Sequence, residues 1–414
     1  MNYVQAIETE VPMRTLFYAT IGLAAFATTA RADSHYSDLI RTDGLAGAEA
    51  TLAALDDPTP SDAFALGGVR FLSAVEGALQ TRYRHDMNSE MMAMMGDMPF
   101  LRLPVAPNPA PEPFRPDVVT TLFGDAIDDL GASLAALDGI TDDDTVAVTI
   151  RPDDLWFDIN GNAVQDPGEA LTYVVSDILD VPPGDSTAGL AIRFDTADVA
   201  WLSAYAHMLS GLSELILSTD PEQAVREVFD GAAQLDRLRG PIPLQLGFFS
   251  ENELGELDTI AALIVALEGP LDGERTRAAH QHFKDGLSDN RVFWRRVALE
   301  TDNDREWIPN DAQQSAMPIV FPAGIGDAWQ EVLSDAEAIL DGRLLLPHWR
   351  LASTGGIDLA SVLQSPPNVD IIGLLQGYTF AEHVKRGQVV DVDSLRRFDD
   401  LTGGASPFFA IVLN

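Results

Sequence analysis

The chain has 414 residues, with 64 acidic side chains against 26 basic ones and a formal net charge of −38 at pH 7. This charge argues against nucleic acid and anionic lipid as partners, because both are bound by basic surfaces, and it favours cations as ligands. The sequence contains no cysteine, which excludes disulfides, thiolate catalysis and thiolate zinc sites.

The first residues have the pattern of a secretory signal peptide. A basic residue precedes the apolar run from Leu16 to Ala27, and Ala30-Arg-Ala32 forms an A-x-A cleavage pattern. We therefore expect residues 1–32 to be removed and the mature protein to be periplasmic or secreted. The apolar run is shorter than the roughly 20 residues of a membrane-spanning helix, so the mature chain should have no transmembrane segment. Acidic residues near Met1 leave Met13 as an alternative start.

Residues 33–103 are predicted to form a helical hairpin followed by a methionine-rich segment. Apolar spacing predicts one helix from Ser37 to Leu55 and a second that is capped by Ser61 or Asp62. Six methionines follow, most of them on one helix face: Met87, Met91, Met92, Met94, Met95 and Met98. Such a stripe is typical of adaptable packing. A hydrophobic ligand groove and copper(I) capture by soft thioethers are the alternatives.

A proline-rich connector and a long, mainly helical region complete the chain. Six prolines in residues 104–117 exclude a helix or a central strand there and predict a stiff connector. Residues 118–414 are then expected to form a mainly helical domain. Helical apolar patterns cover residues 118–137, 199–217, 221–238, 257–267, 273–283, 290–299 and 326–340.

Short strands are predicted beside these helices. Thr145 to Ile150 and Gly189 to Phe194 are expected to pair antiparallel, and Asp195 or Thr196 should cap the helix that follows. Three further strand candidates lie in the tail, at residues 343–346, 388–392 and 408–413. The sequence therefore predicts a multi-helical, mainly α body with a small antiparallel β element.

The stretch from Asp158 to Glu169 has oxygen-bearing side chains at positions 1, 3, 5, 9 and 12 of twelve. This spacing resembles the calcium loop of an EF-hand. The resemblance implies one Ca²⁺ with side-chain ligands at positions 1, 3 and 5, a backbone carbonyl at 7, a direct or water-mediated ligand at 9 and a bidentate carboxylate at 12. In this chain those residues are Asp158, Asn160, Asn162, Val164, Asp166 and Glu169. The modest charge and exported setting imply a Kd on the order of 10⁻⁴ to 10⁻³ M.

The loop departs from the EF-hand pattern at two positions. Position 6, usually glycine, is Ala163, which must take a left-handed conformation at some cost or reshape the loop. Position 8, usually apolar, is Gln165. Since a predicted strand precedes the loop and the sequence has no partner loop, it resembles the solitary EF-type loops of exported bacterial proteins. The resemblance covers twelve residues and implies nothing about the rest of the chain.

The histidines offer weaker candidates. His280 and His282 would lie on different faces of a helix, which favours a solvated helix over a zinc pair. His207 lies in an apolar helix and is expected to be a hydrogen-bonded core histidine.

Three functions follow from these features. The leading one is an exported calcium-binding protein of binding or scaffold type, in which calcium structurally staples a loop. The protein or small molecule that it would bind is unknown. The alternatives are a periplasmic hydrolase with an unplaced active site and a periplasmic copper(I) carrier that uses the Met87–Met98 stripe.

Overall fold

The computed structural model is mainly α-helical with short antiparallel strand pairs, which confirms the predicted fold class. It describes residues 35–87, 100–101, 103–174, 189–239, 251–351 and 354–414. The expected signal peptide and the predicted methionine stripe beyond Met87 lie outside these residues. Residues 34–414 form one compact unit. No helix among the described residues is long and apolar enough to cross a membrane.

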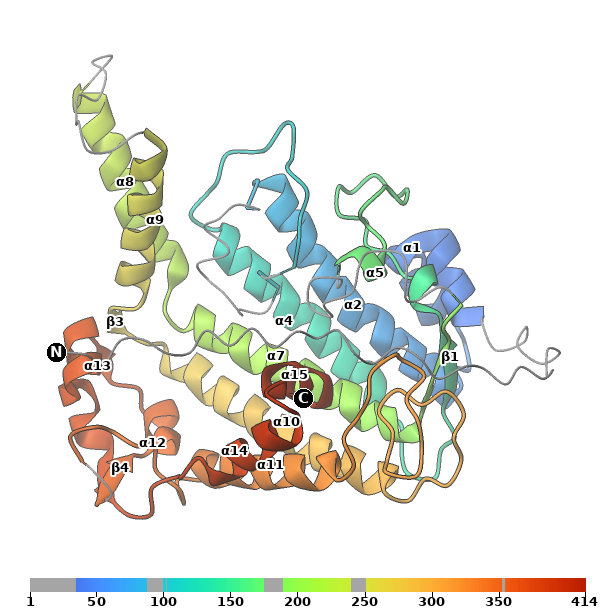
Figure 1. Cartoon of the computed structure of the whole chain (residues 1–414). Coiled ribbons are helices and arrows are strands. Elements are labelled where there is room, and N and C mark those ends of the chain that lie inside the picture. The colour runs from blue at the N-terminus through green and yellow to red at the C-terminus, as the bar shows by residue number, and fades with distance from the viewer. Residues whose placement is uncertain (1–34, 88–99, 102, 175–188, 240–250, 352–353) are drawn as a thin grey trace, which may run out of the picture. The chain divides into compact units, whose positions relative to one another are not determined.

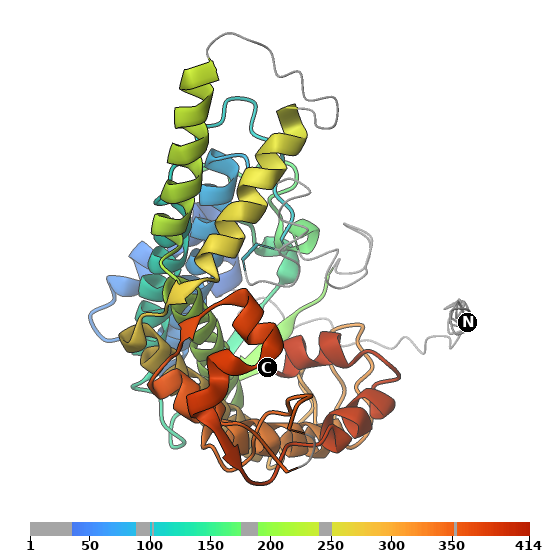
Figure 2. The same cartoon turned by 90° about the vertical axis from the view of Figure 1, so that its left-hand side faces the viewer.

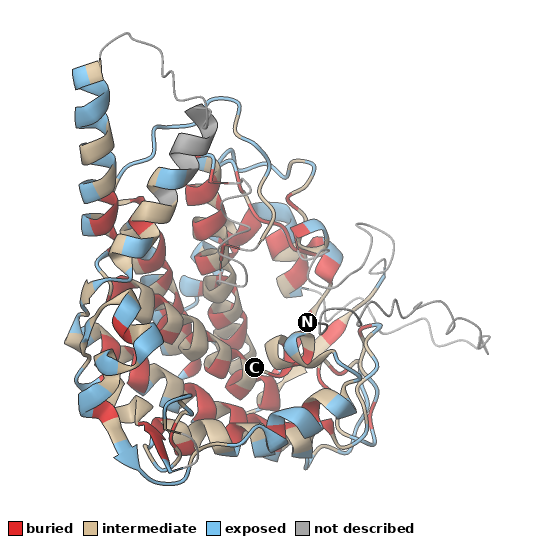
Figure 3. Cartoon of the chain, turned by 60° about the vertical axis from the view of Figure 1, so that its left-hand side comes forward, coloured by how far each residue is buried: buried red, intermediate tan, exposed pale blue. Residues whose placement is uncertain are grey.

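Five helices that pack in succession form the centre of this unit. They are α1 (His35–Ala53), α2 (Pro60–Arg84), α4 (Val118–Leu137), α7 (Thr196–Leu217) and α10 (Gly273–Val297). In Figure 1, α2 lies against α1 and α4, α4 against α7, and α7 against α10. Buried residues follow these contacts along the central helices, whereas much of α8 is exposed (Figure 3).

The starts of α2 and α7 are fixed by capping boxes. Thr59 caps α2 and exchanges hydrogen bonds with Asp62, so the helix begins before the predicted caps, with Pro60 in its first turn. Asp195 caps α7, as predicted, and exchanges hydrogen bonds with the turn that ends at Asp198. A polar side chain that accepts from otherwise free N–H groups stabilises each start by about 1 kcal/mol.

Two predictions for the second half of the chain were wrong. The two helices predicted at residues 273–283 and 290–299 are one continuous helix, α10, which ends at Val297. Residues 408–413 lie in helix α15 (Ser406–Leu413) rather than in a strand. A short, continuous apolar run suits a buried helix as well as a buried strand. Here Pro407 lies in the first helical turn and Phe409 packs into the core beside α10 and α11.

The remaining helices are shorter or less central. In Figure 2 the helices α8 and α9 lie beside each other, and they are in contact. Their bounds, with those of the other helices, are α5 (Leu171–Val174), α8 (Pro221–Arg239), α9 (Glu251–Ala266), α11 (Ile325–Leu340), α12 (Leu359–Gln364), α13 (Ile371–Gln376) and α14 (Asp393–Leu401), with 3₁₀ turns η1 (Pro152–Asp154) and η2 (Tyr378–His383).

The strands form two-stranded pairs. β1 (Ala147–Ile150) pairs antiparallel with β2 (Ile192–Asp195), as predicted. Two further antiparallel pairs join β3 (Gly269–Pro270) to β5 (Asn368–Val369) and β4 (Gly355–Ile357) to β6 (Val384–Arg386). The predicted tail strands at residues 343–346 and 388–392 contribute only isolated bridges in the described chain, such as Leu345 with Val389.

The proline-rich segment has neither helix nor strand in residues 104–115, as predicted. It lies against the C-terminal end of α2. The Asn108 side chain donates to the Tyr83 carbonyl (3.0 Å), and the Glu112 N–H donates to the Arg84 carbonyl (2.8 Å). These bonds satisfy carbonyls that the end of a helix leaves without partners.

Candidate functional site

The two ends of the loop Asp158–Glu169 are held together by backbone pairing. Trp156 and Ala170 form an antiparallel bridge, and the N–H of Phe157 donates to the carbonyl of Glu169 (2.8 Å). β1 and the turn η1 lead into this pairing, and α5 follows it. The loop therefore starts and ends at a fixed point of the fold, although no helix precedes it as in an EF-hand.

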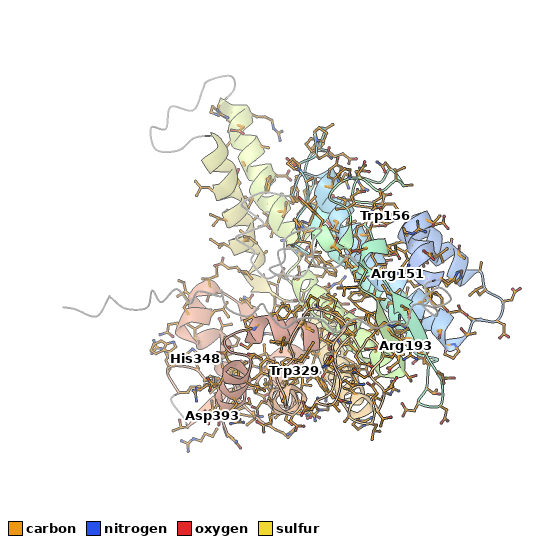
Figure 4. The ribbon with its side chains drawn as sticks, turned by 45° about the vertical axis from the view of Figure 1, so that its right-hand side comes forward. Arg151, Trp156, Arg193, Trp329, His348 and Asp393 are labelled. Atoms are coloured by element: carbon orange, nitrogen blue, oxygen red, sulfur yellow. The ribbon has the colours of Figure 1, made fainter. Side chains whose placement is uncertain are left out.

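A backbone carbonyl of α1 and two side chains of α2 anchor the start of the loop. The indole N–H of Trp156, labelled in Figure 4, donates to the Ile40 carbonyl of α1 (3.0 Å). Glu76 of α2 accepts the N–H of Asp158 (2.7 Å), and Gln80 donates to the Asp158 carbonyl (2.7 Å). Both backbone groups of the first loop residue are thus bonded to one helix face.

Asp158 shapes the turn that follows it. Its two carboxylate oxygens accept the N–H groups of Asn162 and Ala163, each at 2.9 Å. Ala163 has φ 59°, so the first of the two predicted outcomes holds and position 6 adopts the left-handed conformation. That conformation costs a residue with a Cβ about 1–2 kcal/mol. Gly161 and Gly168 take positive φ at no such cost.

Glu169 closes the loop from the other end. Its side chain is buried and accepts N–H groups from Ile159 (2.9 Å) and Asp166 (2.7 Å), one on each carboxylate oxygen. The amides of Asn160 and Asn162 both donate to one oxygen of Asp166, each at 2.7 Å. Five of the six predicted ligand residues are therefore joined through side-chain hydrogen bonds.

Val164 is the sixth predicted ligand residue and differs from the others. Its side chain is 62% exposed, and its N–H donates to the Asn162 side-chain oxygen (2.7 Å). The EF-hand resemblance requires only its backbone carbonyl, so an exposed side chain is compatible with the predicted role.

The loop is an electronegative part of the surface. Burial, followed by the charges of Asp158 and Glu169, raises the pKa of Glu76 to about 7. Burial also raises the pKa of Glu169, against the effect of the N–H groups that it accepts. Crowded carboxylates of this kind are relieved by protons or by a bound cation.

Sequence reasoning missed a second acidic cluster. The carboxylates of Asp195, Glu300 and Glu306 have oxygens within 4.8 Å of one another. Among the described residues, these three form the acidic group that is close enough to hold a metal ion. Arg193 of β2, labelled in Figure 4, lies 3.7 Å from Asp302 and from Asp304 nearby. Burial, with the charges of Asp195 and Glu306, raises the pKa of Glu300 to about 7. No local pattern connects these positions, because only the fold brings residue 195 to residues 300 and 306.

A polar pocket of about 420 Å³ lies between residues of α10, α11 and α14. A pocket of this kind is where the active site of the alternative hydrolase would be sought. Its lining residues are Arg291, Gln330, Glu331, Ser334, Asp335, Ser394 and Arg397. The hydroxyl of Ser394 donates to Asp335, and Arg397 pairs with Glu331. Lining groups that pair with one another in this way favour a structural role.

Of the methionine stripe, the structure describes Met87. Its side chain is buried in a cluster with Phe100 and Leu122, which fits packing. Met91, Met92, Met94, Met95 and Met98 lie outside the described residues.

No protein-family model, curated protein or solved structure matches the chain.

Proposed function

We propose that the protein is an exported calcium-binding protein of binding or scaffold type, in which one Ca²⁺ staples the loop 158–169 to the small β element that precedes it. The observation that carries this proposal is the hydrogen-bonded ring of the loop. Both oxygens of Asp158 and both oxygens of Glu169 face backbone N–H groups of the same turn. Carboxylate, amide and carbonyl oxygens are the ligands that Ca²⁺ prefers.

Ion binding would require local changes. The amides of Asn160 and Asn162 direct their nitrogens at Asp166, and a half-turn of each amide would present the oxygen instead. The left-handed turn at Ala163 that the loop pattern requires is already in place. Three carboxylates in the ligand set would face the two charges of the ion.

A calcium ion held there would stabilise the folded protein rather than open a target groove. The loop is single, and Glu76 and Gln80 of α2 bind its first residue directly. An ion that binds only the folded state adds about 2.7 kcal/mol to the free energy of unfolding at one hundred times Kd.

Terbium luminescence tests the proposal. Trp156 lies two residues before the first ligand, so Tb³⁺ in the loop should show emission sensitised by this indole. Calcium should compete the emission away. Asp158→Ala should abolish it, whereas Asp138→Ala, at an exposed position after α4, should leave it intact. Emission that survives Asp158→Ala would place the ion elsewhere.

A further inference from the structure

The helices α7 and α10 approach each other closely around His207 and His282. Gly286 of α10 is buried, and a Cβ added there would lie 3.2 Å from the Ala204 carbonyl and 3.4 Å from the Cβ of His207. A Cβ on Gly211 of α7 would lie 2.6 Å from the ring of Phe283. The two glycines therefore permit a spacing that brings histidines 75 positions apart in the sequence side by side.

The two imidazoles present the same nitrogen to each other. The Nδ1 atoms of His207 and His282 lie 2.9 Å apart, with the ring centroids at 5.1 Å and the planes tilted by 48°. A proton must lie between two such nitrogens if nothing else does. Two nitrogens bound to one Zn²⁺ at about 2.0–2.1 Å are separated by about 2.9–3.4 Å at right-angled to tetrahedral bond angles. The observed separation therefore matches that of a metal-bound pair, and the rings would have to turn to direct both lone pairs at one ion.

A carboxylate lies behind one of the rings. The Nε2 atom of His207 is 3.9 Å from Asp289, which accepts the hydroxyl of Ser203 at 2.6 Å. Histidines that bind a metal commonly direct the other ring nitrogen at a carboxylate, which fixes the ring and raises its basicity as a ligand. Burial lowers the pKa of both His207 and His282, which favours neutral rings with a free lone pair.

We propose that His207 and His282 bind a divalent transition metal, with Zn²⁺ as the representative ion, through their Nδ1 atoms. Asp289 would position His207 once their 3.9 Å separation shortens to a hydrogen bond, and water fills the remaining coordination sites. Imidazole nitrogen suits zinc, copper and nickel, whereas the loop 158–169 offers only oxygen. The two sites are therefore independent, and the failure of one would leave the other standing.

Calorimetric titration of the full chain with Zn²⁺, at saturating Ca²⁺, tests this inference. We expect one zinc site per chain. His207→Ala and His282→Ala should each weaken it by about tenfold or more, and Asp289→Asn by about tenfold, the lower end for an outer partner. His35→Ala, at an exposed histidine, and Asp158→Ala should bind zinc like the unchanged protein.

A second measurement uses the unchanged protein, because a variant could lose zinc binding simply by failing to fold. Co²⁺ bound by two imidazoles in a site of low coordination number should give visible absorption that Zn²⁺ displaces, together with a zinc-dependent rise in Tm. Absence of both signals would overturn the inference. Zinc binding that is unaffected by His282→Ala in a folded variant would also overturn it, and the histidines would then share only a proton.

Discussion

Glu76 on α2 accepts the backbone N–H of Asp158 at 2.7 Å, so the first residue of the loop is bonded to the central helices through a carboxylate that is not a predicted ligand. Its neighbours Asp158 and Glu169 raise its pKa further beyond the effect of burial. Glu76 therefore contributes both to the anchoring of the loop and to its negative charge. Different substitutions of Glu76 can separate these two effects.

Glu76→Gln and Glu76→Leu should have different effects. Glutamine keeps an oxygen that can accept the Asp158 N–H but removes a charge that the fold disfavours, since the pKa of Glu76 is raised to about 7. Stability without calcium at neutral pH should therefore rise, while calcium binding weakens. Leucine leaves that N–H without an acceptor and should lower the free energy of unfolding by about 1–3 kcal/mol. Urea unfolding in EDTA and calcium titration measure the two effects. Equal stability of the two variants would show that this hydrogen bond does not anchor the loop.

Ala163→Gly should stabilise the calcium-free protein. The alanine has φ 59°, a conformation that glycine adopts without the cost of about 1–2 kcal/mol. Part of that gain is offset because glycine is more flexible in the unfolded chain, by about 0.4–1 kcal/mol. The matched control is Ala135→Gly, on the exposed face of α4, which should destabilise by about 0.5–1 kcal/mol. A loss of stability in both variants, measured by thermal or urea unfolding, would contradict the turn geometry.

The contribution of Glu300 to stability should fall as the pH rises from about 5 to about 7. Burial, with the charges of Asp195 and Glu306, raises the pKa of Glu300 from 4.5 to about 7. Between those values the folded state binds more protons than the unfolded state, so each rise in pH lowers the free energy of unfolding. Burial acts in the same direction at Asp129, whose pKa rises to about 6.

Tm measured against pH in EDTA tests the contribution of Glu300. Glu300→Gln removes the charge and should flatten the fall in Tm, whereas Glu268→Gln, at an exposed position, should leave the profile unchanged. Identical profiles for Glu300→Gln and the unchanged protein would contradict the raised pKa.

The sequence predicted those features of the fold that depend on neighbouring residues, such as helix bounds, helix caps and turn conformations. The α4 helix has the predicted bounds, Asp195 caps α7 as predicted, and Ala163 takes one of the two conformations that the loop pattern allowed. The sequence of α15 predicted a strand because every residue from Phe408 to Leu413 is apolar, so the run lacks the periodicity that distinguishes a helix from a strand.

The clusters that only tertiary packing creates could not be predicted. Glu300 meets Asp195 after about a hundred residues of intervening chain, and His207 meets His282 because glycines let α7 and α10 approach. The spacing of His280 and His282 correctly placed them on different faces, but the prediction of a solvated helix was wrong for His280, which is buried. His280 bonds to the Leu340 carbonyl, and the partner of His282 came from another helix.

Calorimetry of the full chain with millimolar calcium tests the central claim most directly. We predict one site with a Kd of about 10⁻⁴ to 10⁻³ M, accompanied by a calcium-dependent rise in Tm. Glu169→Gln should abolish both signals, and Asp138→Ala should retain them. A flat titration of the unchanged protein, with no calcium-dependent change in Tm, would contradict the claim that this loop binds calcium.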